Sequence, residues 1–219
     1  MKHPKKDRTM PQSSKGFTLI ELLVVIAIIG ALAAITSPMI RSSRLKGKET
    51  STTSRINEIS ISIDRFEGEF GDYPPSSLED YYETSGNRKD SGIESVVICL
   101  ASQKRGGPFM TWKEDWLENL DGDSLNSDEA KEKLDWYFPD STLWEVLDDF
   151  GSPLIYIQNK DYEDTFTITH TEEEEPGTAT GARSEKTKVF HNLTTYQIWS
   201  SGKNQTNENG GGDDLGSWR

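Results

Sequence analysis

The sequence predicts an α+β fold, in which a long N-terminal helix packs on a small domain of antiparallel strands. Three observations lead to this prediction. Residues 17–40 form an apolar stretch, residues 41–72 continue it with an amphipathic pattern, and short strand-like segments follow in residues 73–219. A chain of 219 residues has room for this helix and one modest globular domain.

The N-terminal part of the chain combines a basic leader with an apolar helix. The leader carries Lys2, Lys5, Lys6, Arg8 and Lys15 against the single acidic residue Asp7. The apolar stretch after it holds about 24 residues, enough to span a bilayer at about 1.5 Å per residue. Because basic flanks stay in the cytoplasm, we expect a single-pass protein whose domain 73–219 lies outside the cytoplasm. Glu21, the only charge in the stretch, is costly in a membrane without a partner.

The segment from Lys15 to Glu21, Lys-Gly-Phe-Thr-Leu-Ile-Glu, resembles the class III signal peptide of the type IV pilin family, which includes the pseudopilins of type II secretion systems. The resemblance implies a pilin-like fold with residues 1–16 as leader. It implies that a prepilin peptidase cleaves between Gly16 and Phe17 and methylates the new amine of Phe17. It also implies that Glu21 assists assembly by neutralising the N-terminal amine of a neighbouring subunit.

Two other interpretations of this segment remain open. A secretory signal would have a shorter apolar core and a small-residue cleavage site, which Ala31, Ala33 and Ala34 could mimic. A plain membrane anchor accounts for the apolar stretch and its basic flank. Neither explains the Gly16-Phe17 pair together with a carboxylate at position 21, so the pilin interpretation is favoured.

The helix is predicted to continue to about Phe70. Apolar residues recur there at helical spacing, namely Ile56, Ile59, Ile63, Phe66 and Phe70. Charged residues fall largely on the opposite face, namely Arg55, Glu58, Asp64, Arg65 and Glu67. Gly68, Gly71 and Pro74 mark its end.

The domain is predicted to begin with two short helices, about Gly92–Ser102 and Ser127–Trp136. Trp112 and Trp116 are expected in the core, and Cys99 is expected to be buried and inert, since no second cysteine is present.

Strands are predicted at Leu154–Gln158, Thr165–His170 and Val189–Ser200, the last with a break at Asn192. The polar connection Thr171–Lys188 is predicted to be a long exposed hairpin tip. The segment Asp149–Ile157 resembles the start of a pseudopilin strand, with Phe150 in place of tryptophan.

The C-terminal stretch Ser200–Trp218 alternates oxygen-bearing side chains with glycines, which suits a hard cation such as calcium. It resembles the calcium-binding loop of major pseudopilins, and the resemblance implies a site that includes Ser201, Asn204, Asp213 and Asp214. Asn204 stands where the family has aspartate, so one charge is lost. A flexible loop without metal is the alternative.

The segment Asp121–Ser127, with Glu132 at the twelfth place, is a weaker metal candidate. Leu125 and Asn126 break the EF-hand pattern at its fifth and sixth positions. A turn before a helix that starts at Ser127 explains the segment better.

Composition limits the function. The net charge of −13 argues against nucleic-acid binding, which needs a basic surface. Only three histidines occur, and the sequence carries no nucleophile, zinc or phosphate-loop motif. The chain is therefore expected to be the substrate of a processing enzyme rather than an enzyme.

Taken with the resemblance, these features predict a type II secretion pseudopilin in the inner membrane, with a cytoplasmic N-terminus and a periplasmic domain. The implied partners are copies of itself in a helical filament, minor pseudopilins, the prepilin peptidase and the inner-membrane assembly platform. Two alternatives remain: a major or minor type IV pilus subunit, and an anchored binding or enzymatic domain that does not polymerise.

Overall fold

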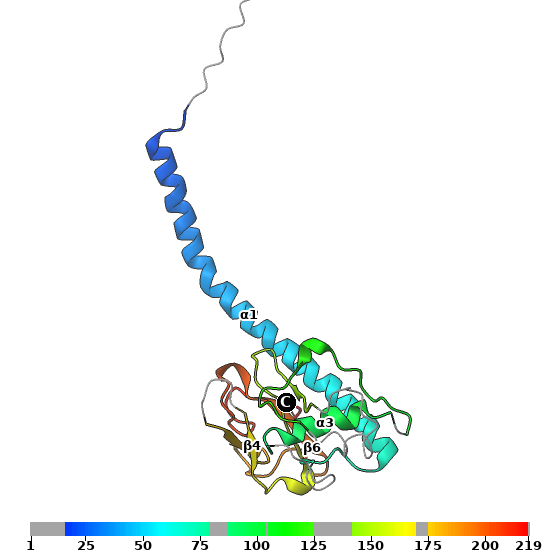
Figure 1. Cartoon of the computed structure of the whole chain (residues 1–219). Helices are drawn as coiled ribbons and strands as arrows, with labels where there is room; N and C mark the ends of the chain where they lie inside the picture. The colour runs from blue at the N-terminus through cyan, green and yellow to red at the C-terminus, as the bar shows by residue number, and fades with distance from the viewer. Residues whose placement is uncertain (1–15, 79–86, 104, 125–141, 170–174, 219) are drawn as a thin grey trace, which may run out of the picture. The chain divides into compact units, whose positions relative to one another are not determined.

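A computed structural model describes residues 16–78, 87–103, 105–124, 142–169 and 175–218 (Figure 1). The chain divides into two units, Met1–Arg44 and Leu45–Arg219. Helix α1, Leu19–Phe70, contributes to both units, which confirms the long N-terminal helix. It ends at Gly71, whose φ of 80° and 2.7 Å hydrogen bond to the Glu67 carbonyl are typical of a glycine that closes a helix.

Within the described residues, the second unit adds one further α-helix, three single-turn 3-10 helices (Glu114–Trp116, Asn159–Asp161 and Gly202–Asn204) and seven short strands. In chain order the α-helix and the strands are α3 (Ser91–Ala101), β1 (Leu117–Glu118), β2 (Glu145–Val146), β3 (Ile155–Gln158), β4 (Phe166–Ile168), β5 (Gly177–Ala179), β6 (Tyr196–Ser200) and β7 (Leu215–Gly216). The strands pair antiparallel as β3-β6-β7, β4-β5 and β1-β2. The fold is therefore α+β, as the sequence predicts.

The central strands β3 and β6 are buried along their whole length, because both faces of this sheet are covered. On one face, Tyr156 and Ile198 are paired in register and join a core shared with α1 and α3. On the other, Ile155 and Trp199 join a second core beneath β4 and β5. The α1 residues in the first core are Ile56, Ile59, Ile63 and Phe66, which confirms the apolar stripe.

Most predicted elements of the domain are confirmed. The helix at 92–102 is α3, and the strands at 154–158, 165–170 and 189–200 contain β3, β4 and β6. The strand predicted at 189–200 is confirmed only over Tyr196–Ser200, because residues 191–195 form bends and turns, with Asn192 at φ of 48°. Trp112 and Trp116 are buried, and Cys99 packs against the first core. The leader 1–15 and the helix predicted at 127–136 lie outside the described residues.

The exposed hairpin tip predicted for 171–188 is wrong over residues 177–182, whereas residues 175–176 and 185–188 are exposed as predicted. Residues Gly177–Ala179 form β5, and Ala179 and Ala182 are fully buried. Gln197 of β6 holds the segment, since its side chain accepts the Ala182 N–H at 2.6 Å and donates to the Ala182 carbonyl at 2.9 Å. Small residues allow this approach: a Cβ on Gly181 would lie 2.7 Å from Cβ of Tyr162.

The assignment of Arg55 to the charged outer face of α1 is also wrong. Its side chain is only 7% exposed and donates a 2.6 Å hydrogen bond to Asp149 in the turn before β3. Helical periodicity predicts on which face of the helix a residue lies. It does not predict the direction of a long side chain at the edge of that face, which can turn into the domain to pair with a buried carboxylate.

Candidate functional sites

The start of α1 is closed by a reciprocal pair of hydrogen bonds between Thr18 and Glu21. The Glu21 N–H donates to the Thr18 hydroxyl at 3.2 Å, and Glu21 Oε2 accepts the Thr18 N–H at 2.8 Å and the Thr18 hydroxyl at 2.7 Å. This geometry is a capping box, which satisfies amides that the first helical turn leaves unpaired. The carboxylate predicted to serve assembly therefore also orders the residues just after the predicted cleavage point.

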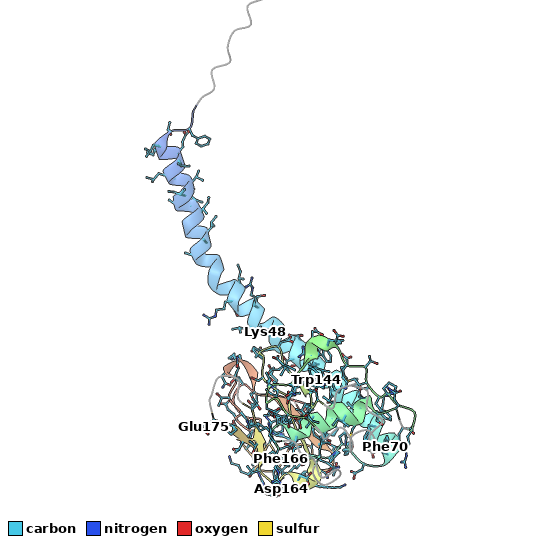
Figure 2. The ribbon with its side chains drawn as sticks, viewed as in Figure 1. Lys48, Phe70, Trp144, Asp164, Phe166 and Glu175 are labelled. Atoms are coloured by element: carbon cyan, nitrogen blue, oxygen red, sulfur yellow. The ribbon has the colours of Figure 1, made fainter. Side chains whose placement is uncertain are left out.

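The apolar half of α1 is exposed to solvent in the described part of its own unit. Every side chain from Leu19 to Ala34 is exposed, and Phe17 before them is 82% exposed (Figure 2). Large apolar side chains that are exposed in such a continuous run mark a surface for lipid or for another protein.

Within the described residues, no helix combines the length and the hydropathy needed to cross a membrane. The membrane span at residues 17–40 therefore stays a prediction.

The turn that resembles a pseudopilin strand start is fastened to α1. Asp149 accepts hydrogen bonds from Arg55 through its side chain, and its N–H donates to the Thr52 hydroxyl at 3.1 Å. Lys48 lies over the ring of Phe150 at 5.4 Å, so the aromatic residue at the tryptophan position also contacts the helix. These contacts anchor the turn on successive turns of α1.

The same turn is linked to the C-terminal loop through a buried carboxylate. One oxygen of Asp148 accepts the N–H groups of Phe150 and Ser152, and the other accepts the Ser200 hydroxyl at 2.5 Å. The Ser200 hydroxyl oxygen accepts the N–H of Gly202 at 2.9 Å. Burial raises the pKa of Asp148, because water that would solvate the charge is excluded.

The four residues of the predicted calcium loop lie in two neighbouring turns. Asp213 Oδ2 accepts the N–H groups of Lys203 and Asn204 at 2.9 and 3.1 Å, so it closes the first turn. Asp214 Oδ2 accepts the N–H groups of Glu208 and Gly210 at 3.1 and 2.7 Å, so it closes the second.

The remaining two predicted ligands differ in exposure. Ser201 is buried, whereas Asn204 is exposed and its side-chain oxygen accepts the Thr206 N–H at 2.9 Å. Asp214 is fully buried and its Oδ1 has no hydrogen-bond partner, which fits a cation ligand. The carboxylates of this loop do not form a group of three or more within the described residues, so calcium there stays a prediction.

Sequence reasoning missed a second acidic group. Asp121 and Asp123 lie in the segment that the sequence analysis interprets as a turn. In the structure their carboxylates are close to those of Glu94 in α3 and Glu145 in β2. A signal was present, since Glu94 is the only charged residue of the otherwise apolar helix Ser91–Ala101. The same signal, a lone carboxylate in an apolar helix, singled out Glu21.

Comparisons with known proteins agree with the N-terminal motif. Residues 11–37 match the family model described as the prokaryotic N-terminal methylation motif, and this segment contains Gly16, Phe17 and Glu21. Over 47 residues the chain is 47% identical to the type IV wide pilus major component PilA4 of Thermus thermophilus, which covers 22% of this chain and 36% of that protein.

Two longer matches extend into the domain. The chain is 34% identical over 125 residues to fimbrial protein Q of Moraxella bovis, covering 54% of this chain and 75% of that protein. It is 32% identical over 114 residues to the type II secretion system core protein G of Escherichia coli K12, covering 52% and 68%. Several other relatives are matched over less than half of their length. No solved structure is significantly similar to the chain.

Proposed function

Because the chain belongs to the family of type IV pilins and type II secretion pseudopilins, we propose that it is a filament subunit of a type II secretion system. In this proposal a prepilin peptidase removes residues 1–16 and methylates Phe17. The subunit then rests in the inner membrane, with its domain in the periplasm, until an assembly platform extracts it. Polymerisation with its own copies and with minor pseudopilins drives protein export.

The observation that carries this proposal is the exposed apolar surface of α1 from Leu19 to Ala34. This surface is exposed in the described part of its unit, so it requires lipid before assembly and neighbouring helices afterwards. A helix that is apolar on all sides can exchange one apolar environment for the other at little cost. A filament subunit that moves from membrane to polymer needs that property.

Glu21 suggests how neighbouring subunits would pair in the filament. A carboxylate inside an apolar helical bundle is tolerated when a positive group lies beside it. The amine that cleavage would create on Phe17 of a neighbouring subunit is such a group. In the unassembled chain the capping box with Thr18 occupies one carboxylate oxygen, Oε2. We propose that the carboxylate keeps this helix start ordered while it pairs with the neighbouring amine.

Calcium in the C-terminal loop belongs to the same proposal. Asp213 and Asp214, with Ser201 and Asn204, would supply oxygen ligands, and the unpartnered Asp214 Oδ1 favours the idea. A bound cation would hold the two turns closed by Asp213 and Asp214 in fixed relation to each other.

A second candidate is a subunit of a type IV pilus. It is favoured by the match to fimbrial protein Q of Moraxella bovis, which covers a larger share of the relative than the match to core protein G covers. In that case the filament would reach the cell surface and serve adhesion, motility or DNA uptake.

One genetic experiment separates these functions. The gene is deleted in its source organism and restored from a plasmid. Extracellular proteins are then quantified by mass spectrometry, and surface filaments are counted by electron microscopy. We expect exported proteins to fall at least tenfold, with surface filaments unchanged. Loss of filaments with normal export would establish the pilus function instead.

Processing is tested on the same strains by intact mass of the membrane-extracted protein. We expect a chain that begins at methylated Phe17. A chain that still begins at Met1 in a strain with active prepilin peptidase would exclude both filament functions and leave an anchored domain.

A further inference from the structure

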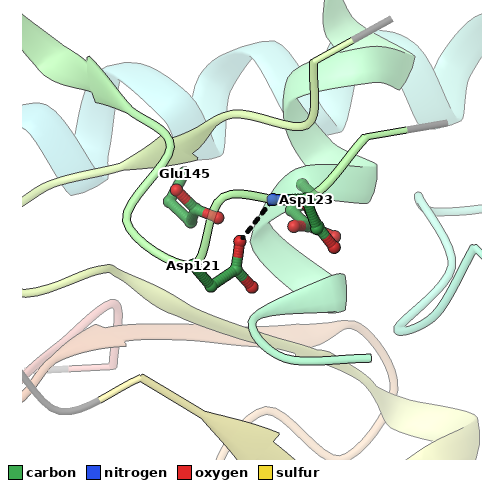
Figure 3. A group of neighbouring side chains, drawn as sticks. Asp121, Asp123 and Glu145 are labelled. Atoms are coloured by element: carbon green, nitrogen blue, oxygen red, sulfur yellow. Dashed lines mark hydrogen bonds between the residues drawn. The ribbon is translucent and has the colours of Figure 1, made fainter. Parts of the chain in front are cut away.

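Four carboxylates gather between three segments of the second unit. They come from α3, from the loop after β1 and from β2, and are Glu94, Asp121, Asp123 and Glu145, hereafter the acidic cluster. Each contributes one oxygen, and these oxygens all lie within 4.8 Å of one another. Figure 3 shows Asp121, Asp123 and Glu145 brought together from the loop and from β2.

In three of the four carboxylates, one oxygen accepts a hydrogen bond from a backbone N–H. Asp121 Oδ1 accepts the Asp123 N–H at 3.4 Å. Asp123 Oδ2 accepts the Asn87 N–H at 3.1 Å, and Glu145 Oε2 accepts the Leu120 N–H at 2.9 Å. The loop itself is braced by Asn119, whose side-chain nitrogen donates to the Asp123 carbonyl at 2.8 Å. The carboxylates are thus oriented before any ligand arrives.

The second oxygen of each carboxylate is the informative one. Asp121 Oδ2, Asp123 Oδ1 and Glu145 Oε1 are buried without a hydrogen-bond partner, and so is Oε1 of the fourth carboxylate, Glu94. Glu94 and Glu145 are 2% and 0% exposed, so bulk solvent does not reach these two carboxylates. A buried oxygen left without a donor costs roughly 1–3 kcal/mol, and more when its group is charged, so a native protein normally satisfies it.

The described surroundings offer no positive side chain to balance this charge. Among the described residues, no lysine or arginine forms an ion pair with the cluster. Within the described residues, this leaves protons or a bound cation to balance the charge of the acidic cluster. A shared proton satisfies two oxygens, whereas a cation satisfies all four.

We propose that the acidic cluster binds one calcium ion. Its donors are carboxylate oxygens alone, which are typical of hard cations rather than zinc or copper. The four oxygens all lie within 4.8 Å of one another, close enough to surround one ion. Magnesium usually keeps several of its waters, whereas calcium accepts six to eight oxygens at flexible geometry, so a set of four protein carboxylates suits calcium better. The remaining ligand positions would be filled by water or backbone carbonyls. The ion would join α3, the loop after β1 and β2.

The test uses the full-length chain in detergent, with calcium as the probe. Isothermal titration gives affinity and stoichiometry, and thermal unfolding is followed with EDTA and with calcium. In the double variant Glu94→Gln/Glu145→Gln, we expect one calcium fewer per chain and a calcium-induced rise in Tm at least halved. With EDTA the variant should unfold at the same temperature as the wild type or higher, because two buried charges are removed.

Glu118→Gln is the matched control, since Glu118 is exposed on β1 and lies opposite Glu145 in the β1-β2 register. It should bind calcium as the wild type does. If the double variant fails to fold, Asp121→Asn replaces it, because Asp121 is only half-buried and asparagine keeps an acceptor for the Asp123 N–H. The proposal is overturned if the folded cluster variant keeps wild-type affinity and stoichiometry, or if the wild type binds no calcium at millimolar concentration. Neither result would bear on the filament function.

Discussion

Arg55 of α1 and Asp149 of the turn before β3 are joined by a 2.6 Å hydrogen-bonded ion pair. A second guanidinium nitrogen donates to the Leu147 carbonyl, and the guanidinium lies 4.6 Å from the centroid of the Trp116 ring. Arg55 is 7% exposed and Asp149 is 23% exposed, so the pair is largely shielded from water. One arginine thereby holds the second half of the long helix to two distant segments of the domain.

Replacing this arginine should destabilise the second unit. Arg55→Met keeps most of the apolar stem but leaves the Asp149 carboxylate and the Leu147 carbonyl without their donor. We expect the free energy of unfolding to fall by about 2–4 kcal/mol, since breaking a buried pair costs about 3–5 kcal/mol and Asp149 is partly exposed. Urea unfolding followed by tryptophan fluorescence measures the change.

Lys113→Met is the control for that prediction. Lys113 pairs with Glu58 at 3.5 Å, and both side chains are about half exposed, at 53% and 51%. Such a surface pair contributes about 0–1 kcal/mol. Equal losses in the two variants would show that burial of the Arg55 pair adds nothing.

The sequence predicts best where one periodic signal dominates. The apolar stripe from Ile56 to Phe66 requires no knowledge of its partners, because helical geometry alone places these residues on one face. The burial of Arg55 depends on the carboxylate of Asp149, which is distant in sequence, so the pattern of residues around Arg55 does not predict it. The burial of residues 177–182 was missed for a related reason, since Gly181 packs against Tyr162 and Ala182 is held by Gln197, both distant from them in sequence.

The candidate sites also differ in how far the sequence predicts them, because one is contiguous in sequence and the other is not. Gly16, Phe17 and Glu21 form a contiguous motif and could be predicted from order and spacing. The acidic cluster draws on three separate segments, so only Asp121 and Asp123 were visible as neighbours. Glu94 in an apolar helix was a usable signal, but its partner Glu145 could be found only from the pairing of β1 with β2.

Asp90 should make the stability of the domain depend on pH. It is 5% exposed, its two oxygens accept the Thr169 N–H at 3.2 and 3.0 Å, and Asp121 and Lys89 act on its charge. Burial is the main reason that its pKa is raised to about 6. The folded state therefore binds the proton more tightly than the unfolded state, so this contribution to stability is present below about pH 4 and is lost as pH rises through about 6.

Asp90→Asn isolates this effect, because asparagine keeps an acceptor for Thr169 and carries no charge. Unfolding free energies of variant and wild type are compared between pH 4 and 8, with EDTA throughout so that no cation alters the field of Asp121. We expect the variant to be more stable by about 2–3 kcal/mol at pH 8, with the difference shrinking toward zero at pH 4. A difference that is constant across this range would show that Asp90 titrates as an ordinary aspartate.

Glu21 combines two roles that substitution can separate. Glu21→Ala removes both the carboxylate charge and the acceptor that closes the capping box with Thr18. We expect this variant to be cleaved and methylated normally and to enter the membrane, but to assemble into filaments at least tenfold less. Filament yield is measured by shearing and immunoblotting, and processing is measured by intact mass.

Glu21→Gln decides which role matters, because glutamine serves in a capping box as well as glutamate does but cannot neutralise an amine. If pairing with the Phe17 amine of a neighbouring subunit drives assembly, Glu21→Gln should fail as Glu21→Ala does. Thr18→Ala, which removes the capping hydroxyl and keeps the carboxylate, should then assemble nearly as the wild type does. Normal filaments from Glu21→Gln together with failure of Thr18→Ala would reverse the assignment, since the ordered helix start, and not the charge, would then be what assembly requires.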